Sequence, residues 1–440
     1  MAISNKTDSS FFQRVIRGIG PAIIVACIVL GPGSILTSSK VGCQFGFELA
    51  WILVAAGVLM FGAIATASRV GVSLEQSPFT ELACRLGRPF AVLVGINVFL
   101  IASCFQYSNN LGVLAAIEPL VELTPVTRAL ILLGLNLFIV ACLFGVQKLY
   151  RRIEHLMMFL MGLMLLGFLV NLMLARPSLI GLLAGLVPGL PDGLSGGFFP
   201  RLEAASDSSP PTMVDPWITV QGLIVTSFSI AGAFYQAHLV REKGWTTDQT
   251  RHGLVDSFIG TAVLIGVTLM IMATSATVLS KRIAPEDLKS AGDVAIQLEP
   301  LFGSAAKWLF CIGILAGAIS SFLVNSILGG TFLADGLGQN ARIDSKWTKI
   351  YTIGALAIGM VVALVTTPDG RVPLIIFAQA MTVLGGPLLA FSLLYLAIQK
   401  ESSGKRIADA WMIGLTAIGA IVVMVLAMRT LFRICLATFG

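Results

Sequence analysis

The residues of this chain that could bind a ligand are hydroxyl and amide side chains placed inside apolar segments. Residues 21–30 are apolar, residues 31–33 read Gly-Pro-Gly, and the hydroxyls of Ser34 and Thr37 follow. Proline lacks a donor N–H and glycine has a low helix propensity, so a membrane helix that begins here should break at its midpoint. Unpaired backbone groups are costly in lipid, so a break at this depth is expected only around a cavity or a bound ligand.

A second polar interruption lies between residues 229 and 245, where Gln236 and His238 follow Gly232. Paired broken helices at corresponding positions point to the substrate site of a secondary transporter. We therefore predict a second break near Gly232, with Ala233, Gln236 and His238 beside the ligand. A lone histidine is more often bonded to a neighbour than to a metal, so the sequence leaves the role of His238 open.

Further polar side chains lie near the middle of other apolar segments. Gln106 and Asn109 are three residues apart and should share one face of a helix. They serve either helix packing or cavity lining, and the sequence does not decide between these. For Ser320 and Ser321 we favour packing and interhelical hydrogen bonds, while Gln379 stands in a later span. No Asp or Glu lies near the middle of the three segments that hold the two breaks and the amide pair.

The composition is that of a helical membrane protein. The chain has 440 residues, 56% hydrophobic and 12% charged, with a mean hydropathy of +0.90, whereas soluble domains are about 25% charged. The net charge of +6 follows the loops and does not indicate a nucleic-acid partner. The seven cysteines are scattered without a CxxC pair, so we expect them to pack as small apolar residues, and we expect no resident metal and no cofactor. No cleavable signal peptide is expected, because the first apolar run continues into a full span.

We expect an all-α polytopic membrane protein with eleven transmembrane helices. Broken helices 1 and 6 suggest two inverted five-helix repeats, followed by one further helix. Most Lys and Arg residues fall in alternate loops, so the positive-inside rule places the N-terminus in the cytoplasm. The predicted spans are 20–44, 47–71, 89–118, 127–147, 154–175, 215–241, 253–280, 303–337, 347–366, 371–399 and 407–431.

On this interpretation the chain has five parts, and none is long enough for a separate soluble domain. They are a cytoplasmic N-terminus (1–19), the first repeat (20–175), an extracellular loop (176–214), the second, inverted repeat (215–399), and span 11 with the C-terminus (400–440). We expect a monomer in the plasma or inner membrane, with the lipid bilayer and a small inorganic ion as its partners.

Several motifs resemble those of the NRAMP family, whose members are proton-coupled divalent-metal transporters with the leucine-transporter-type fold. The motifs are GPGS at residues 31–34, FGFELAW at 45–51, GAFYQAH at 232–238, AGAISS at 316–321, Asp335-Gly336, and Gln379. The resemblance covers most of the chain. It implies a membrane transporter rather than an enzyme, in which two unwound helices hold the substrate.

The departures from the family pattern fall on the residues that carry its chemistry. The metal-binding Asp and Asn of the first span correspond to Gly31 and Ser34. The metal-binding Met of the sixth span corresponds to Gln236, and the acidic residues of the third-span proton path correspond to Gln106 and Asn109. His238 alone matches the family residue.

These changes favour an anion over a divalent cation. A dehydrated divalent cation needs anionic or soft ligands, and removing the carboxylate leaves neutral oxygens against a large desolvation cost. Helix N-termini at the two breaks would present N–H groups and a positive dipole end. We therefore expect a secondary-active transporter of bicarbonate or a comparable oxyanion, working by alternating access. The expected substrate-binding residues are Gly31, Ser34, Thr37, Gln106, Asn109, Ala233, Gln236, His238 and Gln379.

Three alternatives remain open. Sodium is the expected co-ion, bound by the Ile28 carbonyl with Ser320 and Ser321, although coupling to protons through His238 is a further option. The main competitor is a divalent-cation carrier of unusual site chemistry, which takes a partly hydrated Mg²⁺ or Mn²⁺ through carbonyls and amides. A second competitor is a membrane receptor that transports nothing. An enzyme is not expected, because no nucleophile–base pair or phosphate loop is evident.

Overall fold

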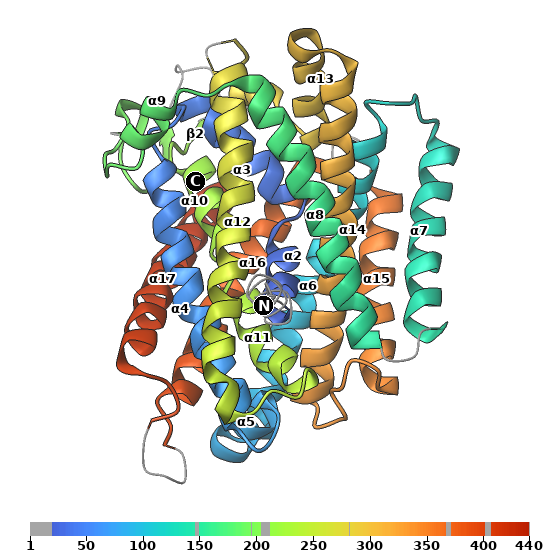
Figure 1. The fold of residues 1–440 in the computed structure, drawn as a ribbon, viewed down its shortest axis with the longest axis vertical. Coiled ribbons are helices and arrows are strands. Elements are labelled where there is room, and N and C mark those ends of the chain that lie inside the picture. Colours follow the sequence, from blue (N-terminus) through green and yellow to red (C-terminus); the bar gives the residue numbers. More distant parts are fainter. Residues whose placement is uncertain are drawn as a thin grey trace, which may run out of the picture.

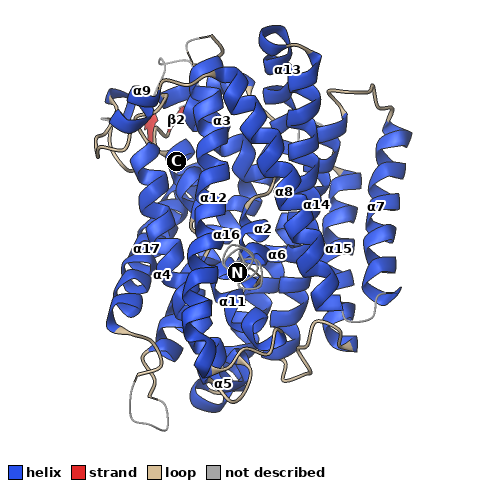
Figure 2. Ribbon diagram, viewed as in Figure 1, coloured by secondary structure: helices blue, strands red, loops and turns tan. Residues whose placement is uncertain are grey.

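The structure is a computed structural model that describes residues 20–145, 149–194, 196–203, 212–280, 282–366, 371–400 and 406–439, and the predicted N-terminal part, residues 1–19, lies outside these. The described chain is almost entirely helical, with one two-stranded antiparallel sheet (Figure 2). The first half contains α2 (Pro21–Val29), α3 (Pro32–Phe45), α4 (Ala50–Ser73), α5 (Pro78–Leu86), α6 (Arg88–Ile117), α7 (Pro125–Gly145), α8 (Leu149–Ala175), α9 (Leu179–Ala184), η1 (Asp192–Leu194) and β1 (Arg201–Glu203). The second half contains β2 (Thr212–Val214), α10 (Ile218–Ser227), α11 (Ile230–Glu242), η2 (Thr247–Gln249), α12 (Thr250–Val278), η3 (Pro285–Asp287), α13 (Ala291–Phe302), α14 (Ser304–Gly336), α15 (Lys346–Val365), α16 (Arg371–Ala397) and α17 (Ala410–Phe439).

The helices confirm the predicted membrane architecture but not the number of spans. Within the described residues, nine helical segments are long and apolar enough to cross a membrane, and the bent pair α2 and α3 adds a tenth. The predicted span 127–147 corresponds to α7, whose apolar stretch Pro125–Ala141 is shorter than a full span by the same measure. The count of eleven therefore stays a prediction.

The first predicted break is confirmed. The axes of α2 and α3 differ by 63°, with Leu30 and Gly31 between them. Gly31 is extended (φ −112°, ψ −179°), and Pro32 opens α3, a position where a missing N–H costs nothing. Gly112 of α6 lies directly against this proline, because a Cβ at Gly112 would come 1.9 Å from the Cγ of Pro32.

The second break lies a few residues before its predicted place. Helix α10 ends at Ser227 and α11 begins at Ile230, and the Ser229 hydroxyl caps α11 by accepting the Gly232 N–H at 3.2 Å. A serine N-cap satisfies one of the unpaired N–H groups of a first turn, so the helix starts before Gly232 instead of breaking there. No proline follows within α11 to interrupt it.

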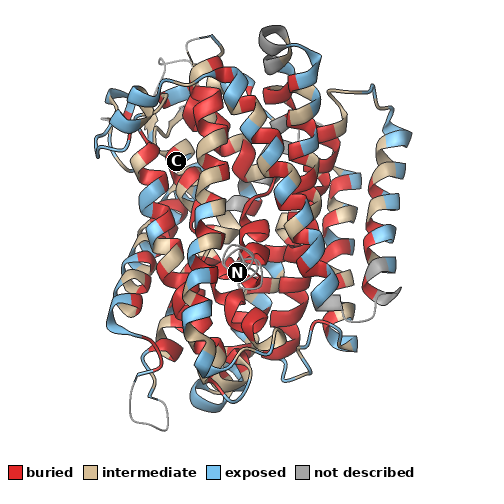
Figure 3. Cartoon of the chain, in the orientation of Figure 1, coloured by how far each residue is buried: buried red, intermediate tan, exposed pale blue. Residues whose placement is uncertain are grey.

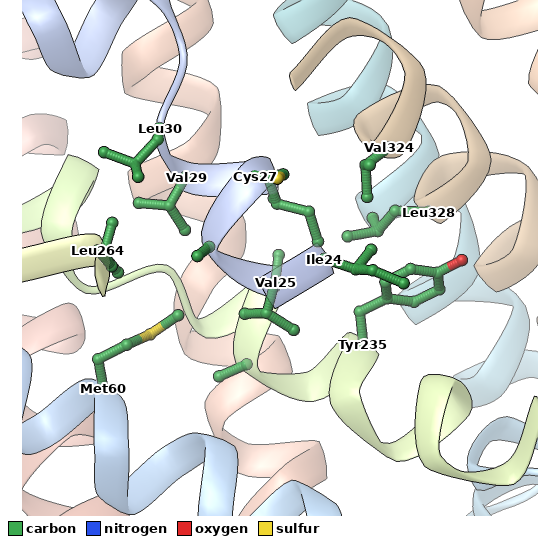
Figure 4. Packing of buried hydrophobic residues seen from close by; sticks show 14 of the residues in the cluster. Ile24, Val25, Cys27, Val29, Leu30, Met60, Tyr235, Leu264, Val324 and Leu328 are labelled. Atoms are coloured by element: carbon green, nitrogen blue, oxygen red, sulfur yellow. The ribbon is translucent and has the colours of Figure 1, made fainter. Parts of the chain in front are cut away.

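Helix α2 lies at the centre of the bundle, and all nine of its residues are buried. Figure 4 shows Ile24 and Val25 among apolar side chains of other helices, including Met60 of α4, Leu264 of α12 and Val324 of α14. Buried residues fill the middle of the molecule and exposed apolar side chains lie on its outer helices (Figure 3), as expected where helices face lipid. Helix α2 also packs against α8, α11, α12 and α14, so any movement of α2 must repack these neighbours.

The two ends of the bundle carry different small elements. In Figure 1, α9, β2 and the end of α13 lie at the top with the C-terminus, and α5 lies at the bottom. We call these the α9 end and the α5 end. Helices α5 and α13 lie between predicted spans and were not predicted from the sequence.

Candidate functional site

The first break lines an enclosed cavity of about 40 Å³, enough for about three water molecules or one small ion. The walls come from α2, α3, α6, α10, α14 and α16, with the residues of both breaks between them. Five residues predicted for the substrate or the co-ion line it: Ile28, Gly31, Ser34, Asn109 and Ser321.

The cavity lies at the N-terminal ends of two helices. Pro32, Gly33 and Ser34 form the first turn of α3, and Ser229 is the N-cap of α11; all four line the cavity. Helix N-termini carry a partial positive charge and suit anions. Because both helices exceed three turns, two positive dipole ends meet at one small cavity.

Most hydroxyls around the cavity already donate to backbone carbonyls. Ser34 donates to Gly31 O at 3.1 Å, Thr226 to Gly222 O at 2.8 Å, and Ser321 to Ile28 O at 3.3 Å. In contrast, Asn109 is 1% exposed, and within the described part of the chain its Nδ2 has no acceptor. The cavity therefore contains a buried amide donor that a ligand could satisfy.

The lining contains no charged side chain among the described residues. The described chain also holds no group of three or more His, Cys, Asp or Glu side chains placed to bind a metal ion. A side chain at Gly31 would be crowded, since a Cβ there would lie 2.8 Å from Ser321 Oγ and 3.5 Å from Asn109 Oδ1. A carboxylate side chain at position 31 would therefore compete for space with the Ser321 hydroxyl and the Asn109 amide.

Gln236 does not line this cavity, contrary to prediction. It is fully buried on α11 and donates from Nε2 to Asp256 Oδ2 at 3.1 Å. The same Asp256 carboxylate of α12 accepts the N–H groups of Gly20 at 2.9 Å and Ala22 at 3.0 Å. Asp256 therefore joins the start of α2 to α11 and α12. We call this set of three hydrogen bonds the α2 latch.

His238 also lies away from the cavity, near the α5 end. Its Nε2 is 3.1 Å from Asp335 Oδ2 of α14, and Asp335 also accepts from the Phe79 N–H at 3.1 Å and the Ser77 hydroxyl. His238 lines a separate, wider hollow of about 410 Å³, together with Arg241 and other charged and polar residues. The sequence could not place it, because its partner comes from a distant helix.

The other predicted residues whose side chains the structure describes lie outside the cavity lining. Gln106 is fully buried against α15, where a Cβ at Gly359 would lie 2.2 Å from its own Cβ. It therefore does not share the cavity with Asn109. Thr37 donates to Gly33 O at 2.7 Å, and Ser320 donates to Gly317 O at 3.0 Å. Ala233 is buried within α11, and Gln379 belongs to α16, where its side chain is outside those that the structure describes.

Sequence reasoning missed several lining residues. Ser108, Thr226, Ser229 and Thr382 line the cavity beside those that were predicted. The run Thr-Ser-Phe-Ser at residues 226–229 is a hydroxyl-rich stretch like the one after Gly31. Because hydroxyl residues favour helix N-caps, that stretch was the available signal for the second break.

Comparison with known proteins decides the family. A family model described as "Natural resistance-associated macrophage protein-like", the Nramp model, matches residues 22–433. The chain belongs to the Nramp family. Its predicted family is confirmed, and so is the predicted class of protein, a membrane transporter.

Two curated relatives are both named divalent metal cation transporter MntH. The one from Deinococcus radiodurans is 23% identical over 418 residues, which cover 94% of this chain and 88% of that protein. The one from Brucella suis is 24% identical over 441 residues, which cover 97% and 90%.

A crystal structure of a mutant Eremococcus coleocola manganese transporter superposes with a TM-score of 0.75 at 17% identity, covering 98% of this chain and 88% of that one. The same transporter in complex with an aromatic bis-isothiourea compound also gives 0.75, covering 99% and 88%. The predicted fold class, an Nramp-type membrane bundle, is therefore confirmed for this Nramp protein.

Proposed function

We propose that this Nramp protein is a secondary-active transporter whose substrate is a small anion, bicarbonate or a comparable oxyanion. The observation that carries the proposal is the unpartnered buried amide of Asn109, a residue that lines a small cavity in which the described side chains include no carboxylate. The two helix N-termini at the same cavity add positive partial charge. Alternating access would come from movement of the broken helices against the rest of the bundle.

The size and chemistry of the cavity oppose a divalent cation. A bare Mn²⁺ or Mg²⁺ loses a hydration energy that neutral oxygens repay poorly. A hydrated Mg²⁺ keeps several waters, while the cavity has space for about three. A four-atom oxyanion needs no more room than that, and it would accept a hydrogen bond from Asn109.

The second candidate is a divalent cation, and the names of the relatives favour it. Both MntH proteins are called divalent metal cation transporters, and they align with more than nine tenths of this chain. In this alternative, carbonyl groups at the first break and the amide oxygen of Asn109 would coordinate a partly hydrated Mg²⁺ or Mn²⁺. The relatives support this candidate, and the lining of the cavity supports the anion.

The coupling ion, orientation and boundaries stay proposals. Sodium would bind near the Ile28 carbonyl, which now accepts from Asn325 Nδ2 at 3.1 Å as well as from Ser321, so those bonds would have to be released. Ser320 would join this site, and His238 would serve if protons are coupled instead. We also propose that residues 20–175 and 215–399 form the two inverted repeats. The N-terminus would lie in the cytoplasm, and the protein would be a monomer in the plasma or inner membrane.

Uptake into proteoliposomes tests the two candidates side by side. Radiolabelled bicarbonate, Mn²⁺ and Mg²⁺ are offered to one preparation, with and without a sodium gradient, and protein-free liposomes report leak. We expect saturable bicarbonate uptake and no saturable metal uptake. Saturable Mn²⁺ or Mg²⁺ uptake without bicarbonate uptake would instead select the second candidate, and no flux of any ion would select a receptor.

A further inference from the structure

A second cavity, of about 60 Å³, lies between α10, α16 and α17. It lies beside the central cavity, and residues of α10 line both. Ile218, Gln221 and Gly222 line only the second cavity, while Val225 and Thr226 line both. These positions are spaced three and four residues apart, so they form a single stripe on the helix. The stripe runs from the second break toward the α9 end (Figure 1).

The far end of this stripe carries an excess of positive charge. Arg429 of α17 is fully buried, donates to Phe198 O at 2.8 Å, and forms an ion pair with Asp215. Arg433, one turn later, reaches the other oxygen of the same carboxylate, with Nε 3.3 Å from Asp215 Oδ2. Two guanidinium groups share one carboxylate, so these three side chains carry a net charge of +1.

Arg433 is the member of this set that lines the cavity. Its contact with Asp215 uses Nε, and within the described residues no acceptor is paired with its two terminal nitrogens. A guanidinium holds planar oxyanions through two parallel N–H groups. The cavity therefore has a charged donor with free N–H groups on one wall.

The side chain of Gln221, which also lines this cavity, is held in one orientation. Gln221 accepts from Arg429 through Oε1, and its Nε2 donates to Thr430 Oγ1 at 2.7 Å. The buried arginine thus fixes which end of the amide is the donor, and Thr430 Oγ1 itself donates to Leu426 O at 2.9 Å. Gln221 and Thr430 are 8% and 5% exposed, so these polar groups are preorganised away from bulk solvent.

We propose that this cavity is an outer binding site for a monovalent oxyanion, with Arg433 as its charged ligand. The ion would reach the central cavity along the stripe of α10 that passes Val225 and Thr226. This inference rests on the proposed anion transport and names a selectivity residue outside the central cavity. A net positive charge at this position attracts an anion and repels a divalent cation.

Bicarbonate uptake by variant proteins in proteoliposomes tests the outer site. Arg433→Gln should raise the KM at least fivefold and leave kcat within twofold, because the central cavity is unchanged. Arg433→Lys, which keeps the charge but loses the planar fork, should fall between Arg433→Gln and the wild type. Arg201→Gln is the matched control, since Arg201 is an exposed arginine on β1 paired with Glu203, and its KM should not change.

A second variant fills the cavity without removing an arginine. Ala380 of α16 lines the outer cavity but not the central one, so Ala380→Leu should also raise the KM. If Arg433→Gln does not fold, the KM of Ala380→Leu still tests the outer site. Intact wild-type bicarbonate uptake with an unchanged KM in the folded variants would overturn the outer site alone. Wild-type Mn²⁺ uptake in place of bicarbonate uptake would overturn the proposed function, and the outer site with it.

Discussion

At the scale of single residues, the proposed preference for an anion depends most on Asn109. This residue combines near-complete burial, a position in the cavity wall and an unsatisfied donor. A buried donor without a partner costs about 1–3 kcal/mol, so a ligand that accepts from it recovers that energy. Four of the neighbouring hydroxyls already donate to carbonyls, those of Ser34, Thr226, Ser321 and Thr382, whereas the amide nitrogen of Asn109 has no acceptor among the described residues.

Asn109→Asp should convert this donor into a negative charge. Like charges about 4 Å apart repel by about 4 kcal/mol at an effective dielectric constant of 20, so bicarbonate uptake should fall more than tenfold in apparent affinity. The measurement is the KM for bicarbonate uptake together with Mn²⁺ binding by calorimetry. Asn340→Asp is the control, because it makes the same chemical change at an exposed residue near the α5 end. Undiminished bicarbonate affinity in Asn109→Asp would remove Asn109 from the site.

Gly31→Asp restores a carboxylate at the first break and should reduce anion uptake for two reasons. The charge repels the anion, and the added Cβ lies only 2.8 Å from Ser321 Oγ. Gly31→Asn has nearly the same size without the charge, so the difference between the two variants isolates repulsion. We expect uptake by Gly31→Asp to be at least tenfold below that of Gly31→Asn; equal rates would show that crowding alone acts here.

At the scale of elements, α2 is the part whose position controls the cavity. Its hydrophobic packing holds it in the bundle, and the α2 latch fixes its first turn. Asp256 is fully buried, accepts two backbone N–H groups and one amide, and stands at the positive end of the helix. The pair Lys243–Glu154, at 2.9 Å, lies against the same turn, where a Cβ at Gly20 would come 1.9 Å from Lys243 Nζ.

Asp256→Asn should loosen this end of α2. The two backbone N–H groups donate to different oxygens of Asp256, and an amide has only one oxygen. One buried donor therefore loses its partner, at a cost of about 1–3 kcal/mol. Cys27 on α2 is fully buried, and its modification by a membrane-permeant maleimide, followed by mass spectrometry, should become at least fivefold faster. Asp287→Asn changes an exposed aspartate in the same way and serves as the control. Equal labelling rates in both variants would mean that the latch does not hold α2.

Gly112→Ala tests how closely α6 must approach the first break. The new Cβ would sit 1.9 Å from Pro32 Cγ, and overpacking of a filled core costs about 1–3 kcal/mol. The thermal unfolding midpoint in detergent should therefore drop. Gly162→Ala on α8 meets nothing within 4 Å and should leave it unchanged. A normal midpoint for Gly112→Ala would indicate that Pro32 can shift freely.

The two breaks also show how much of the structure could be predicted from the sequence alone. The first break was predictable, because Gly-Pro-Gly at residues 31–33 stops a helix by local chemistry. The second was placed too late, because it depends on a serine cap at Ser229 and no proline marks it. Gln236 and His238 were assigned to the ligand, yet each contacts a carboxylate on another helix, Asp256 and Asp335. Such pairings depend on how distant segments meet and leave no local pattern.

At the scale of the whole molecule, an Nramp bundle surrounds a cavity whose lining differs from the family's metal-binding pattern. The fold and the family follow from matches over nearly the full chain. Among the described residues the central cavity has no charged lining, and Arg433 of α17 lines the neighbouring cavity beside α10. The architecture thus belongs to the Nramp family, while our proposal of an anion rests on the lining of the cavity.

The most direct test is to see which ion occupies the cavity. Crystals grown with both Mn²⁺ and hydrogen selenite, a monovalent oxyanion that scatters anomalously, allow the two ions to be located separately at their absorption edges. We predict a selenium peak in the central cavity, close enough to Asn109 for a selenite oxygen to accept from Nδ2, and no manganese peak between Gly31 and Ser229. A manganese peak at that position, without selenium, would contradict the account.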